Sequence, residues 1–469
     1  MHETHSGVVI LLGDLAYKIK KPVDLGFLDF RSHDARTLAC QNELRLNRRL
    51  ARDVYLDVGG FSRSLDTTSE PVLVMRRMPD DRRLSTLILD GADVAGDLRL
   101  LARRMADFHA GAARGPAISA AAGAAALARR WDDNLREVVP YAGTVLDDGV
   151  LKRVRRAVTR FLDGRTVLLN ERAAGGFAVD GHGDLIADDV FCLDDGPRIL
   201  DCLEFDDALR WVDVLDDMAF LAMDLEFLGR ADLAGQLLDA YAEFSAAPIV
   251  EALRHHYIAY RAFVRAKVAC IRAAQGDPDA ARDAVQLADL ALRHLETGEV
   301  RLILVGGAPG TGKTTVATAL ADRLGATYLS TEVIRGEHNG PDTDRYTKEA
   351  KTATYRAVLE RARHLLERGQ SVVADATWGE LAWRREAGEL ATTTASMLTQ
   401  LVCEAPVDVA AARAEQRLRT GYSPSQAGGE IARTLATHRD PWPDAIRIDT
   451  SGTAEGAIAR AVGVTARRR

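Results

Sequence analysis

The sequence lacks the features that would place the chain in a membrane, on an export pathway or on a nucleic acid. No apolar run approaches the roughly 20 residues that cross a bilayer. The short apolar stretch near the N-terminus has no basic region before it, and Gly13-Asp14 interrupts it, so it predicts neither a signal peptide nor an anchor. A net charge of −7 argues against general nucleic-acid binding, which needs a basic surface. We expect a cytoplasmic protein.

Paired cysteines are also missing, and lysine is scarce. The five cysteines are odd in number, far apart and without a CxxC pair, which favours reduced thiols over a disulfide framework or a zinc site. They are Cys40, Cys192, Cys202, Cys270 and Cys403. Among the few lysines, three cluster at 18, 20 and 21, and one lies in a glycine-rich loop at 313. An arginine-rich chain is expected to keep lysine where a compact point charge suits a site better than the planar arginine fork. Both places are therefore candidate sites.

The chain is too long for one ordinary domain. It has 469 residues, of which 47% are hydrophobic, enough for two or three domains with cores of their own. We see no internal repeat and no low-complexity linker. From about 298 onwards apolar strands alternate with helices, which is typical of a parallel α/β sheet. We therefore predict an α+β domain over 1–297 and an α/β domain over 298–469.

The first domain is expected to mix hairpins with helices. Alternating apolar residues and turn chemistry predict strands at 8–12, 15–20 and 71–78, and a hairpin of 190–193 with 198–200. Helical spacing predicts helices over 34–51, several between 95 and 165, and more from 212 to 295. The alanine-rich stretch 117–130 is either helix or a mobile segment.

The second domain opens with a phosphate-binding pattern. Residues 301–320 contain Gly307-x4-Gly312-Lys313-Thr314, the P-loop or Walker A motif. Its glycines let backbone N–H groups cradle phosphate oxygens, its lysine reaches the β- and γ-phosphates, and its threonine hydroxyl ligates Mg²⁺. A chance match is disfavoured, because a buried-strand pattern precedes the loop and a helix ending at Gly325 follows it. The predicted nucleotide-binding set is Gly307, Gly310, Gly312, Lys313, Thr314 and Thr315.

Polar residues at the ends of the next strands are candidates for catalysis. Asp375 ends the strand SVVAD, where an acid either helps to hold Mg²⁺, orients the acceptor or merely caps a helix. Glu332 and Arg335 follow another short strand and suit an acceptor hydroxyl and a phosphate. Arg413 and Arg417 lie one turn apart on the expected helix from 407. They either clamp phosphates under a lid or form a solvated charged face.

Over roughly 300–450 these motifs resemble the small P-loop kinases that include gluconate, shikimate and zeta-toxin-like kinases. The resemblance implies ATP and Mg²⁺ as cofactors and a small-molecule hydroxyl as acceptor. The sequence departs from that group by carrying Glu332 where an aspartate is usual.

The first domain contains a second candidate site around HGDLIADD. Asp184 is followed by Asp189, a predicted hairpin and Asp201, the order in which kinase-type phosphotransfer uses a catalytic base and two Mg²⁺ ligands. An ordinary acidic turn is the alternative. A lysine on a strand should contact the phosphates, held by a helix glutamate. We choose Lys18, with Lys20 as alternative, and Glu43, although these lysines would also suit a solvated strand face.

HGDLIADDV with LDCLEFD resembles the aminoglycoside-phosphotransferase-like kinases, whose loop reads HGDLHxxN. ELRLNRRLA and FDDALRWVDVLDDMAFLAMDLE are similar to a bacterial group in which such a domain is fused to a C-terminal P-loop kinase, often called bifunctional aminoglycoside phosphotransferase/ATP-binding proteins. Ile186 replaces the family's histidine and Asp189 its asparagine.

These patterns together predict an ATP- and Mg²⁺-dependent phosphotransferase with two fused kinase-like domains and an unknown small-molecule acceptor. One alternative is a nucleotide-binding regulatory protein with an N-terminal pseudokinase and a slow P-loop ATPase. Another is a zeta-toxin-like kinase that acts on nucleotide sugars. Neither a nucleic-acid nor a membrane partner is expected.

Overall fold

A computed structural model describes residues 2–3, 7–24, 29–62, 69–338, 347–420 and 439–466. Contacts divide the chain into two units. The N-terminal unit comprises Met1–Leu151, Leu169–Ile249 and Arg254–His294, and the C-terminal unit comprises Lys152–Leu168, Val250–Leu253 and Leu295–Arg469. The predicted division near 298 lies beside Leu295, but no sequence signal separated the two short segments.

An antiparallel five-stranded sheet in the order β1-β2-β3-β5-β4 begins the N-terminal unit. Its strands are β1 (His2–Glu3), β2 (Gly7–Leu12), β3 (Leu15–Lys20), β4 (Tyr55–Phe61) and β5 (Glu70–Arg76). Gly13 makes the tight β2–β3 turn with a positive φ of 57°, which glycine adopts without strain. The helix α1 (His33–Asn47) begins where the Ser32 side chain accepts a hydrogen bond from the Ala35 amide, as N-cap serines do.

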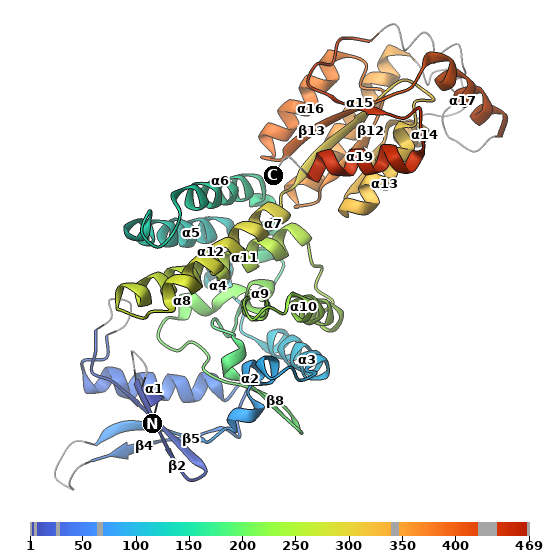
Figure 1. Cartoon of the computed structure of the whole chain (residues 1–469). Coiled ribbons are helices and arrows are strands. Elements are labelled where there is room, and N and C mark those ends of the chain that lie inside the picture. The colour runs from blue at the N-terminus through green and yellow to red at the C-terminus, as the bar shows by residue number, and fades with distance from the viewer. Residues whose placement is uncertain are drawn as a thin grey trace. The chain divides into compact units, whose positions relative to one another are not determined.

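Two short strand pairs and many helices complete this unit (Figure 1). β6 (Ala178–Asp180) pairs with β9 (Trp211–Asp213), and β7 (Val190–Leu193) pairs with β8 (Gly196–Ile199). The alanine-rich stretch is helical on both sides of Gly123. The helices are α2 (Leu84–Leu89), α3 (Ala95–Gly111), α4 (Pro116–Ala122), α5 (Ala124–Glu137), α6 (Asp148–Gly164), α7 (Thr166–Ala174), α8 (Asp207–Arg210), α9 (Val214–Phe227), α10 (Ala231–Ser245), α11 (Glu251–Ala274) and α12 (Ala280–Thr297), of which α6, α7, α11 and α12 extend into the C-terminal unit's segments.

The C-terminal unit contains a parallel sheet in the order β11-β12-β10-β13-β14. Its strands are β10 (Arg301–Gly306), β11 (Thr327–Ser330), β12 (Val372–Asp375), β13 (Met397–Glu404) and β14 (Ile446–Asp449). Residues 302–305 of the central strand β10 are fully buried, because helices cover both faces of a parallel sheet. The helices are α13 (Lys313–Leu324), α14 (Thr331–His338), α15 (Lys348–Glu367), α16 (Leu381–Thr393), α17 (Val407–Thr420) and α19 (Ala454–Ala466).

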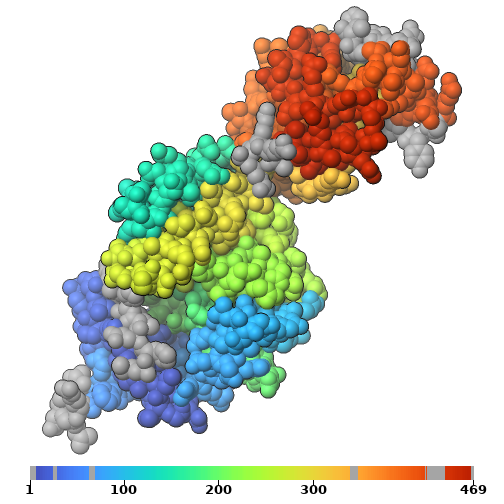
Figure 2. Space-filling model, in the orientation of Figure 1, coloured from blue at the N-terminus to red at the C-terminus, as the bar shows by residue number. Residues whose placement is uncertain are grey.

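The fold classes predicted for the two parts, α+β and then α/β with a parallel sheet, are confirmed. In the space-filling view the late residues of the chain, coloured orange to red, form much of the visible surface of the C-terminal unit (Figure 2). Within the ranges given above, no helix is both long enough and apolar enough to cross a membrane.

Candidate phosphotransfer sites

The P-loop of the C-terminal unit connects β10 to α13 and needs its glycines. Gly307, Gly310 and Gly312 have φ values of 144°, 82° and 79°, which L side chains rarely adopt. A Cβ at Gly310 would lie 1.9 Å from the Ala410 carbonyl oxygen of α17. Helix α13 starts directly at Lys313, so its free N–H groups face the loop, where an anion is stabilised.

Beneath this loop Thr314 and Asp375 are joined. The Thr314 hydroxyl donates to Asp375 Oδ2 over 2.7 Å, and the Tyr328 hydroxyl donates to the same oxygen over 2.8 Å. Asp375 is only 3% exposed, yet its Oδ1 is buried without a hydrogen-bond partner. Buried carboxylate oxygens are normally satisfied, and Mg²⁺ prefers such hard oxygens and keeps most of its waters. Thr314 and Asp375 therefore fit a magnesium ion.

Glu332 and Arg335 contact each other at the start of α14. Arg335 Nη1 lies 3.0 Å from Glu332 Oε2, an i,i+3 pair. The strand β11 that leads into α14 ends at Ser330, which pairs with Asp375 in the sheet. Glu332, predicted to contact the acceptor hydroxyl, and Arg335, predicted to contact a phosphate, therefore follow the same sheet edge as Asp375. Their opposite charges are paired.

The two lid arginines differ in their placement. Arg413 Nη1 donates to the Thr450 carbonyl over 3.0 Å, and the Thr450 hydroxyl donates to the Thr311 carbonyl of the P-loop over 2.7 Å. Arg413 is thus connected to the phosphate loop through Thr450, a residue that sequence reasoning missed. Arg417 is half-buried one turn later on α17.

In the N-terminal unit the predicted lysine, glutamate and second metal aspartate meet. Lys18 Nζ lies 2.7 Å from Glu43 Oε1 and 2.6 Å from Asp201 Oδ1. Burial opposes the charge of Lys18, but Asp201, Glu43 and Glu204 raise its pKa well above the usual value. The alternative, Lys20, is more deeply buried and pairs with Glu43 Oε2 at 2.6 Å and with Glu204. Both lysines therefore join one charge cluster, and Lys18 is the one that reaches Asp201.

The three aspartates of the candidate loop experience different environments. Burial raises the pKa of Asp184 to about 6. Burial, Asp201 and Asp184 together raise the pKa of Asp189 well above its usual value. Burial also opposes the charge of Asp201, but Lys18 holds its pKa below the usual value. Since like charges so arranged repel, the loop favours bound cations.

The backbone at Asp201 has a φ of 61°, a left-handed conformation that costs an ordinary residue about 1–3 kcal/mol. Its amide donates to the Tyr55 hydroxyl over 3.0 Å, which helps to hold that conformation. Among the described residues, no three His, Cys, Asp or Glu side chains are gathered as a preformed metal-binding group. Asp189 and Asp201 would therefore supply two ligands, a number that suits Mg²⁺ with its retained waters.

A buried aspartate on α9 fixes the candidate catalytic loop. Asp217 accepts hydrogen bonds from the amides of His182 (2.7 Å) and Gly183 (2.8 Å) and contacts His109 Nε2 at 3.0 Å. Although burial opposes its charge, the contacts with His109 and His182 lower the pKa of Asp217. A carboxylate that accepts hydrogen bonds from two backbone amides holds the loop in place, so the backbone directly before Asp184 is fixed.

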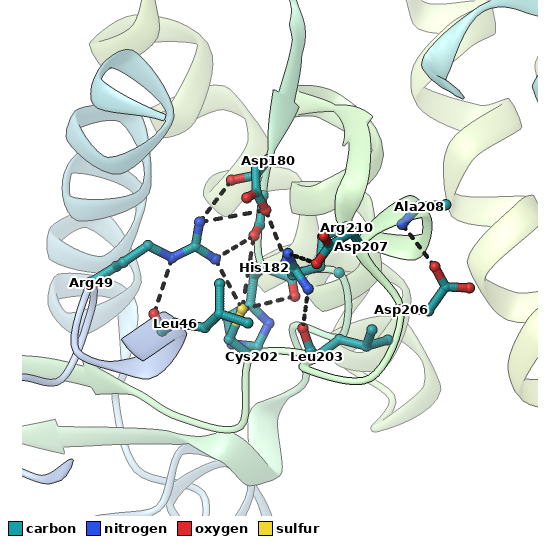
Figure 3. A network of polar contacts seen from close by, with 12 residues as sticks. Leu46, Arg49, Asp180, His182, Cys202, Leu203, Asp206, Asp207, Ala208 and Arg210 are labelled. Atoms are coloured by element: carbon teal, nitrogen blue, oxygen red, sulfur yellow. Dashed lines mark hydrogen bonds and ion pairs between the residues drawn. The ribbon is translucent and has the colours of Figure 1, made fainter. Parts of the chain in front are cut away.

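Two arginines brace the same loop from two sides, as Figure 3 shows. Arg49 donates to the carbonyls of Asp180 (3.1 Å) and Gly181 (2.9 Å) and contacts Cys202 Sγ at 3.1 Å. Arg210 donates to Asp180 Oδ1 (2.9 Å) and the Leu203 carbonyl (2.8 Å). The segments around Asp184 and Asp201 are thereby tied together. Neither arginine was predicted, because Arg49 contacts backbone carbonyls distant in sequence and the carboxylates of Asp180 and Asp207 that Arg210 contacts belong to no motif.

The comparisons with known proteins cover both parts of the chain. A family described as an AAA domain matches residues 302–441. Uncharacterized proteins of Mycobacterium tuberculosis (strain H37Rv) and of Mycobacterium bovis are each 44% identical over 471 residues, covering 98% of this chain and 94% of theirs.

Similar solved structures include a gluconokinase from Sinorhizobium meliloti (19% identity, 36% of this chain and 93% of that chain, TM-score 0.28). A GDP and kanamycin complex of APH(2")-IIia is 16% identical, over 62% of this chain and 91% of that chain, with a TM-score of 0.41. A choline/ethanolamine kinase family protein from Mesorhizobium loti is 17% identical, over 61% and 87%, with a TM-score of 0.39.

Proposed function

The chain belongs to the family of these mycobacterial relatives, and we propose that it is an ATP- and Mg²⁺-dependent phosphotransferase with two fused kinase-like units. The observation that carries this proposal is the Thr314–Asp375 pair beneath the P-loop, with one buried carboxylate oxygen left unpartnered. The acceptor would be the hydroxyl of a small molecule.

At the C-terminal site the chain's own residues would bind and orient ATP. The P-loop amides and Lys313 would hold the β- and γ-phosphates, while Thr314 and Asp375 would hold Mg²⁺. When bound, Mg²⁺ supplies charge neutralisation on those phosphates. Glu332 would accept the proton of the acceptor hydroxyl. At the same time the hydroxyl oxygen would bond to the γ-phosphorus, and the bond between the γ-phosphorus and the oxygen that bridges it to the β-phosphate would break, which releases ADP. Arg335 would then compensate charge on the transferring group.

At the N-terminal site Asp184 would act as the base. A pKa of about 6 leaves it ionised at neutral pH while keeping it close to the value of an efficient proton acceptor. Lys18, held by Glu43, would contact the phosphates, and Asp189 and Asp201 would hold Mg²⁺. To contact the nucleotide phosphates, Lys18 would have to give up its ion pair with Asp201.

One observation favours a second candidate function. Lys18 is already paired with two carboxylates, and Asp189 adds a third carboxyl group to the site. These features also suit a nucleotide-binding regulatory protein, in which the N-terminal unit is a pseudokinase and the P-loop unit a slow ATPase.

The test is Mg-ATP titration calorimetry on the full chain, with Lys313→Ala and Asp184→Ala variants. We expect Lys313→Ala to remove one site or weaken it at least tenfold, and Asp184→Ala to retain nucleotide binding. Phosphorus NMR of ATP incubated with a library of small hydroxy compounds should show a new phosphate ester beside ADP.

The outcomes separate the alternatives. If Lys313→Ala retained every site of the wild-type chain at full affinity, the P-loop assignment would be wrong. A single site that Lys313→Ala removes would identify the N-terminal unit as a pseudokinase. ADP and inorganic phosphate without any ester would favour the regulatory ATPase.

A further inference from the structure

A strained tryptophan follows the strand that carries Asp375. Trp378 has a φ of 48° and is fully buried. This conformation costs an ordinary residue about 1–3 kcal/mol, so the surroundings must impose it. The Trp378 indole donates to the Ala374 carbonyl over 3.1 Å, and Arg384 donates to the Trp378 carbonyl over 3.2 Å. Backbone strain held by several contacts points to a functional constraint on the preceding residue, Thr377.

The Tyr355 hydroxyl of α15 determines how Thr377 uses its proton. Tyr355 is only 2% exposed, accepts a hydrogen bond from the Trp378 amide (3.2 Å) and lies 3.0 Å from Thr377 Oγ1. If Thr377 donated, the Tyr355 O–H would be a buried donor with no acceptor among the described residues, which costs about 1–3 kcal/mol. Tyr355 is therefore the donor. The Thr377 hydroxyl keeps its own proton for another acceptor.

Thr377 itself lies beside the phosphate loop. Thr377 is half-buried and lines a pocket together with Gly307 and Ala308 of the P-loop, Lys351 of α15 and Glu380. The Thr377 carbonyl accepts a hydrogen bond from the Gly307 amide over 3.3 Å. The threonine is thus joined through its backbone to the first P-loop glycine and through its side chain to Tyr355.

The charge of this pocket favours an anion. Lys351 pairs with Glu380, and Arg439 pairs with Glu404. Arg384, which is 5% exposed, donates to three backbone carbonyls but has no carboxylate within ion-pair distance in the described ranges, and its Nε is buried without a partner. Asp440 and Asp444 act on this guanidinium only from beyond ion-pair distance. A buried charge without a directly paired carboxylate is costly, so an anionic ligand at this pocket would be stabilised.

We propose that Thr377 is a substrate-binding hydrogen-bond donor of the C-terminal site, that Tyr355 and Trp378 are its positioning residues, and that its partner is an anionic oxygen. This inference rests on the proposed kinase function. The oxygen belongs either to the γ-phosphoryl group of ATP or to a carboxylate or phosphate of the hydroxy acceptor. An acceptor bound here would then be an acidic polyol or a phosphorylated one.

The test uses the full chain as background and follows the nucleotide site that Lys313→Ala removes; the variants are Thr377→Val, Thr377→Ser and Tyr355→Phe. A hydrogen bond to a charged group corresponds to roughly a tenfold or larger change in affinity. We expect Thr377→Val to bind ADP within twofold of the background. It should bind at least one of two kinds of probe at least tenfold more weakly. The first is a non-hydrolysable ATP analogue, and the second is gluconate or glycerol 3-phosphate added to the ADP-loaded protein. Thr377→Ser should restore binding, and Tyr355→Phe should give an intermediate loss.

The affected probe identifies the source of the oxygen. Weaker binding of the ATP analogue alone assigns it to the γ-phosphoryl group, and weaker binding of an anionic polyol assigns it to the acceptor. Sorbitol, an uncharged polyol, is the control. The inference is overturned if Thr377→Val changes neither the affinity for the ATP analogue nor that for an anionic polyol by more than twofold. A probe that binds neither the background nor the variant counts as unchanged. The inference is also overturned if sorbitol binds better than both anions. Failure of the kinase assignment would appear separately, as unchanged ATP binding in Lys313→Ala.

Discussion

Asp189 carries a carboxyl group where Asp184 and Asp201 already repel it. Because its pKa is raised in the folded state, the folded chain binds this proton more tightly than the unfolded chain. Its favourable contribution is therefore present at low pH and is lost as the pH rises through the raised pKa. We predict that Asp189→Asn raises the free energy of unfolding at pH 8 by about 1–2 kcal/mol in magnesium-free buffer, and by less at pH 5.5. Denaturant titration at both values measures this.

The matched control is Asp188→Asn, which removes the same charge from an exposed neighbour. Its amide oxygen can still accept from Ser85, and Asp188 is the smallest of the named repulsions on Asp189, so stability should change by less than about 0.5 kcal/mol. With Mg-ATP bound, Asp189→Asn should instead be less stable than the wild type, because the variant replaces a carboxylate ligand of Mg²⁺ with a weaker amide ligand. An Asp189→Asn chain that was destabilised at pH 8 without magnesium would contradict this account of the loop.

At the scale of single residues, motif spacing predicted charged groups that the structure brings together, but not the residues whose hydroxyl groups contact them. Lys18, Glu43 and Asp201 were chosen from the order of a strand, a helix and a hairpin, and the structure places them in contact. Tyr328 and Tyr355 were missed because each acts through one hydroxyl on a residue from a different element. Such contacts have no fixed spacing along the chain.

Adjacent histidines on α11 should make the protein sensitive to acid. Burial lowers the pKa of His256 to about 3 and that of His255 to about 4, and the Trp131 indole donates to His256 Nε2 over 3.0 Å. Because the unfolded chain takes up these protons near pH 6.5 and the folded chain does not, stability is full above that pH and falls below it. For His256 the loss at pH 5 is about 2 kcal/mol.

Replacing His256 by glutamine, which can still accept from Trp131, should therefore reduce the fall in unfolding free energy between pH 7 and pH 5 by about 2 kcal/mol. His364 on α15, whose side chain is 61% exposed, is the control, and its glutamine variant should follow the wild-type curve. Identical curves for the wild type and His256→Gln would show that His256 titrates normally.

A buried arginine joins the ends of two helices in the C-terminal unit. Arg165, between α6 and α7, donates to the carbonyls of Leu366 at the end of α15 and Thr394 at the end of α16 (2.9 Å). Burial lowers its pKa to about 10, so it remains charged, which suits helix C-termini. We predict that Arg165→Met lowers the free energy of unfolding by about 2–4 kcal/mol, measured by denaturant titration.

Arg153→Met, on the helix α6 that precedes Arg165, is the control. Arg153 is 47% exposed and pairs with Glu296, so its loss should cost less than about 1 kcal/mol. Equal effects of the two changes would mean that the buried carbonyls find other donors.

Element prediction followed the strength of each local pattern. The P-loop strand and helix were predicted well, because a buried parallel strand and a glycine-ended helix both leave clear signals. Strand β4 was missed: Gly59 and Gly60 weaken its pattern, it is an edge strand, and its pairing with β5 is irregular near Tyr55.

For the whole molecule, the C-terminal unit is not one continuous segment. It includes residues 152–168 and 250–253, and a Cβ added to Gly164 would lie 2.2 Å from the Thr394 carbonyl oxygen. We predict that a fragment of residues 298–469 unfolds at least about 5 °C below the P-loop unit of the full chain, because it loses Arg165 and the apolar contacts of that segment. Thermal unfolding with and without ADP measures this.

Adding a 1–297 fragment in trans is the control and should restore part of the loss. If 298–469 alone melted cooperatively at the full-chain temperature and bound ADP equally well, the inserted segments would be dispensable.

The sequence by itself determined the P-loop, the HGD loop, the two fold classes and the charged groups of each site, because these depend on residue type and spacing over short distances. Only the tertiary structure decided which carboxylate meets which lysine, that Asp375 keeps one unpartnered oxygen, that Tyr355 directs Thr377, and that an early segment completes the later unit. Those outcomes depend on burial and on contacts between distant elements, where desolvation makes each hydrogen bond or its absence count.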